Sequence, residues 1–168
     1  MNSLKTPKPL LAARMAFPLA ASLITVLLGE WIARGALTAD TVTSFIFPHA
    51  EAYLLAWLFL LLVWLLLDWI FRLPPLSTLG MAVLGCVPCA VNFYPLQLRG
   101  EPFLPWDLAQ VSEAAGVASA AGIKIQTSMI VTVVVELALM AGSFFLYRGR
   151  HKQRWLPRVA GSAATAAA

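Results

Sequence analysis

Four apolar runs dominate this chain, and each is long enough to cross a membrane. They cover about residues 15–33, 53–71, 76–93 and 127–147. A transmembrane helix needs about 20 mostly apolar residues to cross a hydrocarbon core of roughly 30 Å. Only 12% of the 168 residues are charged, against roughly 25% in ordinary soluble domains. The sequence therefore predicts an all-α membrane protein with four transmembrane helices, and it contains no nucleic-acid-binding motif.

Charged residues flank the four runs unevenly, and this pattern predicts their orientation. If both termini lie in the cytoplasm, nine of the 12 basic residues are cytoplasmic and six of the eight acids are outside. Such an excess of cytoplasmic Lys and Arg is the rule for membrane proteins. The nine are Lys5, Lys8, Arg14, Arg72, Arg148, Arg150, Lys152, Arg154 and Arg158.

The chain is therefore predicted to have three parts. Residues 1–14 form a cytoplasmic lead, and residues 15–147 form the membrane domain. Residues 148–168 form a basic cytoplasmic tail, whose Ala-rich end is interpreted as the start of a truncated fifth span. A cleaved signal peptide is the alternative for the first run, but the run is long for one and lacks a good cleavage site.

The segment between the third and fourth runs combines Pro, Gly, aromatic and charged residues. Its three prolines, of which Pro95 is the first, predict a break from helical geometry within residues 92–108, because proline lacks an N–H and restricts the residue before it. Asp107 is a favourable N-cap for a short Ala- and Ser-rich helix. Residues 94–124 are therefore predicted to form an outer loop with a short helix on the membrane surface.

This segment also resembles a known family. The string Arg99-Gly-Glu-Pro-Phe-Leu-Pro-Trp-Asp-Leu108, with Asn92-Phe-Tyr before it and Glu113-Ala after it, resembles the N-terminal membrane region of lipoteichoic acid synthase-like proteins of the sulfatase and alkaline phosphatase superfamily. Glu30-x-x-x-Arg34-Gly and Pro48-His49 agree with that region in order. The resemblance covers roughly residues 27–125.

The resemblance implies more than this chain contains. Members have a fifth span and then a large extracytoplasmic domain, in which a Thr nucleophile and a divalent metal such as manganese transfer phosphoglycerol. This chain has four runs and no such domain, and Pro95 stands where many members have a basic residue. The resemblance thus predicts a membrane domain with no cofactor of its own, acting with a catalytic domain or a sulfatase-like partner.

The predicted lipid-headgroup site consists of Arg99, Glu101, Trp106 and Asp107. A guanidinium group binds phosphate through paired hydrogen bonds, and Arg99 is expected at the outer interface, where phosphatidylglycerol headgroups lie. The alternative is that Arg99 pairs with Glu101 or Asp107 and shapes the loop. Trp106 is then an interface anchor.

Glu136 lies near the middle of the fourth run. Because an acid inside a membrane is energetically costly, it is a candidate functional residue. The alternative, which we favour, is a structural role in which Glu136 pairs with Asn92, Tyr94 or a polar residue of the first run.

Cys86-Val-Pro-Cys89 has the spacing of a redox motif. It lies near mid-membrane, however, and there is no second cysteine pair to pass electrons on. Packing residues are therefore the preferred interpretation. The two histidines, His49 and His151, fall on opposite sides of the membrane, so no metal site is predicted.

Three functions remain open. The first is the membrane domain of a lipoteichoic acid synthase-like phosphoglycerol or phosphoethanolamine transferase, which anchors the enzyme and presents phospholipid, with phosphatidylglycerol as the implied lipid. The second is a non-catalytic scaffold or partner protein of the cell envelope. The third is a thiol–quinone oxidoreductase. The expected location is a bacterial cytoplasmic membrane, and the sequence does not specify an oligomeric state.

Overall fold

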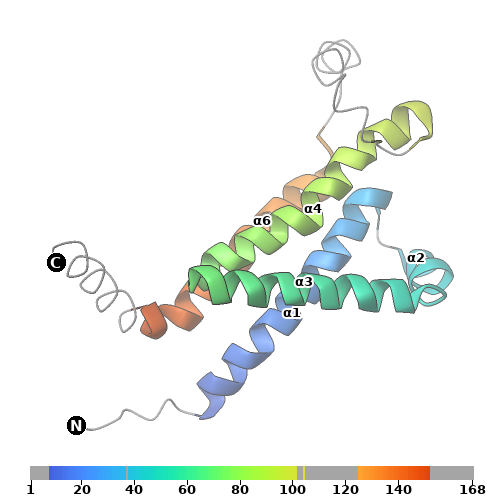
Figure 1. Ribbon diagram of the computed structural model, residues 1–168. Coiled ribbons are helices and arrows are strands. Elements are labelled where there is room, and N and C mark those ends of the chain that lie inside the picture. Colours follow the sequence, from blue (N-terminus) through green and yellow to red (C-terminus); the bar gives the residue numbers. More distant parts are fainter. Residues whose placement is uncertain (1–7, 37, 102–103, 105–124, 152–168) are drawn as a thin grey trace, which may run out of the picture.

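The computed structural model describes residues 8–36, 38–101, 104 and 125–151 of the chain (Figure 1). Within these residues every regular element is helical. The long helices are α1 (Lys8–Arg34), α3 (Ala50–Phe71), α4 (Pro74–Arg99) and α6 (Thr127–His151). Each is long and apolar enough to cross a membrane, so the predicted all-α, four-span fold is confirmed.

Helices α1 and α4 form the centre of the bundle, and each packs against the other three long helices. Aromatic side chains fill one part of the interface. The ring of Phe17 lies 6.4 Å from that of Trp64 and 6.1 Å from that of Tyr147. Trp64 is 2% exposed and donates its indole N–H to the hydroxyl of Thr78 on α4, over 3.0 Å. A buried indole N–H needs such a partner, so this contact fixes how α3 lies on α4.

The two ends of the bundle differ in charge. We call the end that carries Arg14, Arg72 and Arg148 the basic end. There Arg14 donates to the carbonyl of Leu146 over 3.0 Å, and the hydroxyl of Tyr147 donates to the carbonyl of Arg14. These bonds join the start of α1 to the finish of α6.

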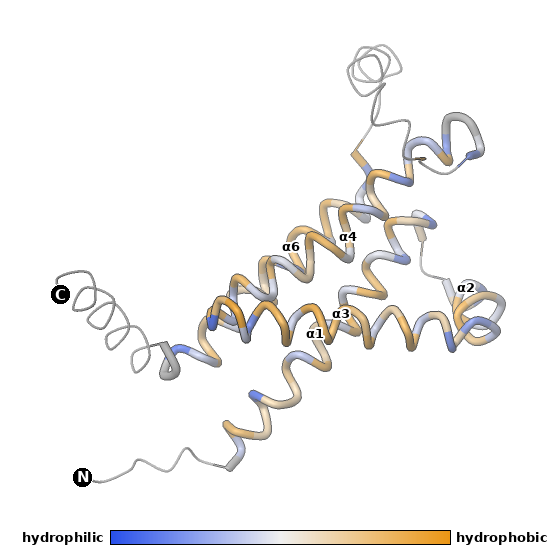
Figure 2. Tube along the Cα trace, in the orientation of Figure 1, coloured by the Kyte–Doolittle hydropathy of each residue, from blue (hydrophilic) through white to orange (hydrophobic). Residues whose placement is uncertain are grey.

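We call the opposite end the acidic end, where α1 and α4 finish and α3 and α6 begin. It carries four described acids, Glu30, Asp40, Glu51 and Glu101. Figure 2 shows the hydrophilic residues gathered towards the ends of the helices and the apolar ones between them.

The chain between α1 and α3 is mostly helical. Helix α2 (Ala39–Thr41) is followed directly by the π-helix η1 (Val42–Ile46). Thr38 caps α2, accepting from the backbone N–H of Thr41 over 3.2 Å. This short helical segment covers the acidic end beside Arg34, whose guanidinium carbon lies 3.5 Å from the centre of the Phe45 ring.

Helix α4 extends further than the sequence predicted. The third run was predicted to end near residue 93 and the loop to begin at 94, but the helix continues through Pro95 to Arg99. The predicted break within residues 92–108 is present, at Gly100. The helix ends at Gly100, which has φ 72° and donates its N–H to the carbonyl of Leu96 over 3.1 Å. A glycine in this left-handed conformation is a common helix terminator. The predicted surface helix lies outside the described residues.

Candidate functional site

Only part of the predicted headgroup site can be placed. Arg99 is the last residue of α4, and Glu101 lies exposed just beyond it at the acidic end. The side chain of Arg99, and the whole of Trp106 and Asp107, lie outside the described part of the chain. The structure therefore brings Arg99 and Glu101 to the same end of the bundle without testing whether the four residues act together.

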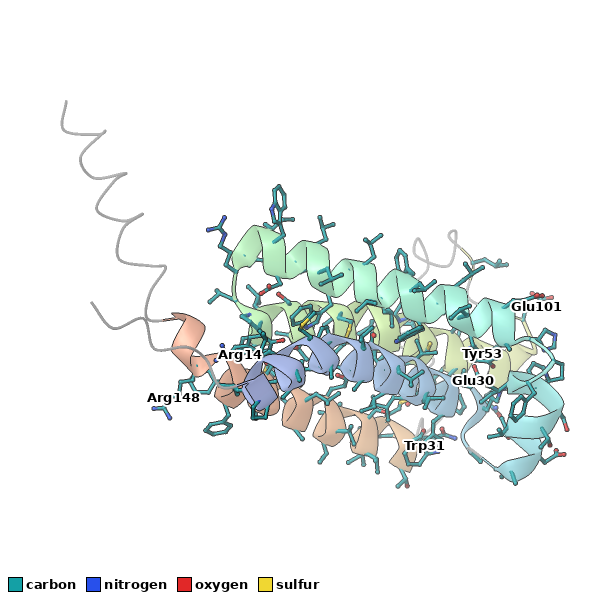
Figure 3. All side chains as sticks on the ribbon, turned by 90° about the horizontal axis from the view of Figure 1, so that it is seen from below. Arg14, Glu30, Trp31, Tyr53, Glu101 and Arg148 are labelled. Atoms are coloured by element: carbon teal, nitrogen blue, oxygen red, sulfur yellow. The ribbon has the colours of Figure 1, made fainter. Side chains whose placement is uncertain are left out.

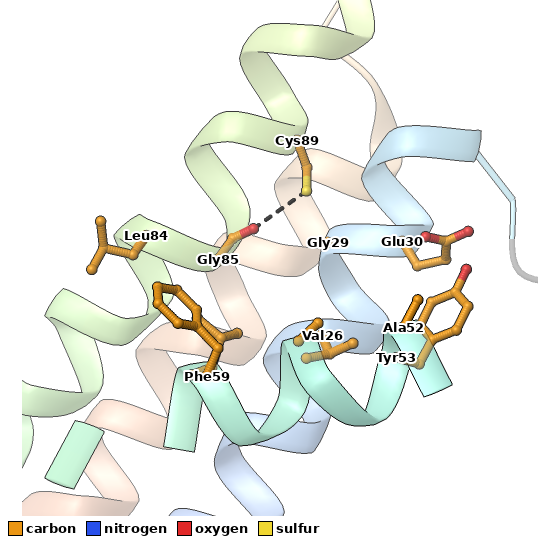
Figure 4. A pocket seen from close by; sticks show the side chains of 11 residues that line it. Val26, Gly29, Glu30, Ala52, Tyr53, Phe59, Leu84, Gly85 and Cys89 are labelled. Carbon is orange, nitrogen blue, oxygen red and sulfur yellow. Dashed lines mark hydrogen bonds between the residues drawn. The ribbon is translucent and has the colours of Figure 1, made fainter. Parts of the chain in front are cut away.

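The acidic end contains a pocket that the sequence did not predict. It has a volume of about 310 Å³ and lies between α1, α3 and α4 (Figure 4). In Figure 1, α3 and α4 are joined at the basic end and diverge towards the acidic end. The lining residues are Val26, Gly29, Glu30, Ala52, Tyr53, Ala56, Phe59, Leu60, Leu84, Gly85 and Cys89.

Small residues create this pocket. Gly29 on α1 faces Gly85 on α4: a Cβ added at Gly29 would lie 3.3 Å from the Gly85 carbonyl oxygen and 3.2 Å from the Cys89 sulfur. Such close backbone approach is a common form of helix packing in membranes. On the α3 side, Ala52 and Ala56 leave space that larger side chains would fill. The wall is therefore mostly apolar, and its shape depends on these glycines and alanines.

Two polar residues, Glu30 and Tyr53, line the pocket, and Arg34 lies beside it, paired with Glu30. We call these three residues the rim. Arg34 donates from Nε to the carboxylate of Glu30, one helical turn away on α1. The spacing of four residues places the two side chains on one face of the helix, which favours such a pair. The hydroxyl of Tyr53 on α3 lies beside Glu30, as Figures 3 and 4 show, within interaction range of both charged groups.

The ion pair is partly withdrawn from water. The side chain of Glu30 is 16% exposed and that of Arg34 is 30% exposed. Charges in this position interact more strongly than fully solvated ones, because the surrounding dielectric constant is lower. The Phe45 ring also contacts the guanidinium group of Arg34 from one side. This contact fixes a cation next to Glu30, which lines the apolar pocket.

Glu136 belongs to a different place, the core of the bundle. Its Oε1 accepts from the hydroxyl of Thr25 on α1 over 2.8 Å, and the sulfur of Cys86 on α4 lies 3.9 Å away. The expected pairing with a polar residue of the first run is thus present. Two buried oxygen atoms on α6, Glu136 Oε2 and the hydroxyl oxygen of Thr132, have no hydrogen-bond partner among the residues that the structure describes. Glu136 therefore links α1, α4 and α6 through one carboxyl oxygen.

The two cysteines are free thiols that face different neighbours. Cys86 points to Glu136, whereas Cys89 lies 3.3 Å from the carbonyl of Gly85, one turn earlier on α4. Both are at helix contacts within the bundle, which supports their interpretation as packing residues.

Neither histidine contributes to a metal site in the described part of the chain. His49 stacks on Phe45 at the acidic end, and His151 is the last residue of α6 at the basic end. Within residues 8–36, 38–101, 104 and 125–151, no three His, Cys, Asp or Glu side chains are grouped to hold a metal ion.

The chain matches no family model, no curated protein and no solved structure. The pocket must therefore be interpreted from its own chemistry. Its apolar wall reaches the bundle surface, where Phe59 is 59% and Leu84 is 53% exposed. A carboxylate, a hydroxyl and a fixed cation lie at one end. That is the arrangement needed to hold a molecule with an apolar tail and a charged head.

Proposed function

We propose that this chain is the membrane domain of a lipid-dependent transferase, and that it binds a phospholipid and presents the headgroup at the outer face of a bacterial cytoplasmic membrane. The observation that carries the proposal is the pocket with its apolar wall and its Glu30–Arg34–Tyr53 rim. Pockets of roughly 300–1,000 Å³ with few polar groups are typical of ligand sites.

A phospholipid suits this pocket because both of its parts find a partner. Carbon atoms of an acyl chain would contact apolar side chains such as Phe59, Leu60 and Leu84. The phosphate would be held by Arg34, since guanidinium groups bind phosphate through paired, charge-assisted hydrogen bonds. A lipid can approach from the bilayer itself, because neighbouring residues of α3 such as Leu55 and Leu62 are largely exposed on the bundle surface.

The proposed orientation places the acidic end outside. Arg14, Arg72 and Arg148 then face the cytoplasm, as the positive-inside rule favours. The pocket mouth would meet the outer leaflet, on the same side as Arg99, Glu101 and the loop that resembles lipoteichoic acid synthase-like proteins.

The catalytic step is assigned to a separate part. By the resemblance, a sulfatase-like domain with a divalent metal such as manganese would attack the presented headgroup and transfer phosphoglycerol or phosphoethanolamine. The bundle would supply anchoring and lipid.

Native mass spectrometry tests this proposal. The purified chain in mild detergent is incubated with mixed bacterial phospholipids, as wild type and as the Arg34→Gln variant. Arg72→Gln, an exposed arginine at the basic end, is the matched control. We expect wild type and Arg72→Gln to retain one class of phospholipid. The affinity of Arg34→Gln for that lipid should be lower by about tenfold or more, equivalent to about 1.4 kcal/mol of binding free energy.

Equal retention by all three proteins would contradict the proposal. Retention of no lipid by any of them would leave an anchor or envelope scaffold, the second function suggested by the sequence. An Arg99→Ala variant in the same experiment tests the loop arginine: weaker binding there would extend the site from the pocket to the loop.

A further inference from the structure

We infer that the pocket selects a phospholipid whose headgroup carries a primary ammonium as well as a phosphate, the phosphoethanolamine type. This inference rests on the proposed function. It differs from the phosphatidylglycerol that the sequence resemblance implies, and it comes from the charges of the rim.

The rim presents both signs of charge at a fixed spacing. Glu30 and Arg34 lie one helical turn apart on the same face of α1. The Cβ atoms of two residues at this spacing are about 5–6 Å apart. In a phosphoethanolamine headgroup two methylene carbons separate the ammonium from the phosphate ester, a similar short spacing. The ammonium can therefore reach Glu30 while the phosphate reaches Arg34.

Binding would exchange one set of ion pairs for another. The contact between Glu30 and Arg34 opens, and each charged group takes the complementary group of the lipid. Arg34 remains positioned by the Phe45 ring during this exchange, because the ring contacts the guanidinium from the opposite element, η1. Tyr53, at the start of α3, adds a hydroxyl that can donate to the phosphate.

Other headgroups match this rim less well. Phosphatidylglycerol places a neutral glycerol where Glu30 needs a cation, so the partly buried carboxylate lies unpaired beside a phosphate. An unpaired charge withdrawn from water is costly. Phosphatidylcholine brings a cation, but its trimethylated nitrogen has no N–H to donate to the carboxylate. The ammonium form supplies three donors.

A competition experiment tests the selectivity. Wild type is incubated with equal amounts of phosphatidylethanolamine, phosphatidylglycerol and phosphatidylcholine of identical acyl chains, and the bound lipid is read by native mass spectrometry. Glu30→Gln removes the carboxylate charge with little change in shape. Glu51→Gln, at the same end on the first turn of α3 and exposed, is the matched control.

We expect wild type and Glu51→Gln to retain phosphatidylethanolamine at least tenfold over the other two lipids. Glu30→Gln should lose that preference over phosphatidylglycerol while still retaining phospholipid through Arg34. Glu30→Asp, which keeps the charge, should restore part of the preference. The phospholipid that Glu30→Gln still retains shows that this variant folds.

The outcomes separate the inference from the proposed function. Retention of phosphatidylglycerol equal to or above phosphatidylethanolamine, with loss in Arg34→Gln, overturns the inference and leaves the proposed function standing. A phosphatidylethanolamine preference that survives Glu30→Gln overturns the assignment to this rim. Retention of no phospholipid by wild type overturns both.

Discussion

Replacing Gly85 by alanine should loosen the contact between α1 and α4 and destabilise the bundle. A Cβ at this position would lie 2.6 Å from the Cγ2 of Thr25 and 3.0 Å from the Cδ1 of Leu60. Favourable contacts between carbon atoms are at about 3.5–4.0 Å. The added methyl group therefore forces either the neighbouring side chains or the helices to move.

Thr25 cannot move at little cost. It is fully buried, and its hydroxyl lies 3.0 Å from the carbonyl of Ala21 and 2.8 Å from Oε1 of Glu136. Its β-branched side chain also has few alternative rotamers. Rotating it would leave Glu136 with fewer hydrogen bonds inside the membrane, so separation of α1 from α4 is the expected response.

The magnitude follows from two costs and one gain. Overpacking of a tight contact costs about 1–3 kcal/mol, and loss of an interhelical hydrogen bond in a membrane protein costs about 0.6–1.7 kcal/mol. Alanine in place of glycine recovers about 1 kcal/mol of helix propensity. We expect Gly85→Ala to lower the free energy of unfolding by on the order of 1–3 kcal/mol.

Gly142→Ala is the matched control on α6. There an added Cβ meets only the Cε2 of Phe17, at 4.0 Å, so stability should be unchanged or raised by up to about 1 kcal/mol. Unfolding in mixed micelles with increasing SDS, followed by circular dichroism, measures both variants. A Gly85→Ala protein as stable as wild type would refute the packing argument.

Two further predictions concern the bundle core. Glu136→Gln should have a free energy of unfolding within about 1 kcal/mol of wild type, because the amide oxygen still accepts from the Thr25 hydroxyl. Loss of all function with intact folding would instead indicate proton or ion handling. Replacing Cys86 and Cys89 together by alanine should leave phospholipid retention unchanged, because both thiols are free and packed between helices. Thiol–quinone oxidoreductase activity that is present in wild type and lost in this variant would favour the redox alternative.

The sequence predicted the parts of the fold that depend on local composition. The four spans follow from the length of the apolar runs, and the Glu30–Arg34 pair follows from helical spacing. The third run was placed at about residues 76–93, whereas α4 continues to Arg99. A proline near the last turn removes one hydrogen bond, whereas the left-handed Gly100 provides the actual termination.

The pocket could not be predicted because it depends on how helices distant in sequence pack. Gly29 and Gly85 are ordinary small residues until α1 and α4 are placed face to face. Tyr53 was assigned to the second span, yet only the packing of α3 on α1 brings its hydroxyl beside Glu30 (Figure 4). The one available signal was the set of small residues spaced along three different spans.

The central claim is that the pocket holds a particular phospholipid, and site-directed photocrosslinking tests it in the membrane. A benzophenone side chain is placed at Phe59, which lines the pocket, or at Leu62, which lies on the same helix and is 63% exposed. After illumination in bacterial membranes, the attached lipids are identified by mass spectrometry. The account predicts one enriched phospholipid class, the phosphoethanolamine type, at Phe59, and the bulk membrane composition at Leu62. The same lipid composition at both positions would contradict it.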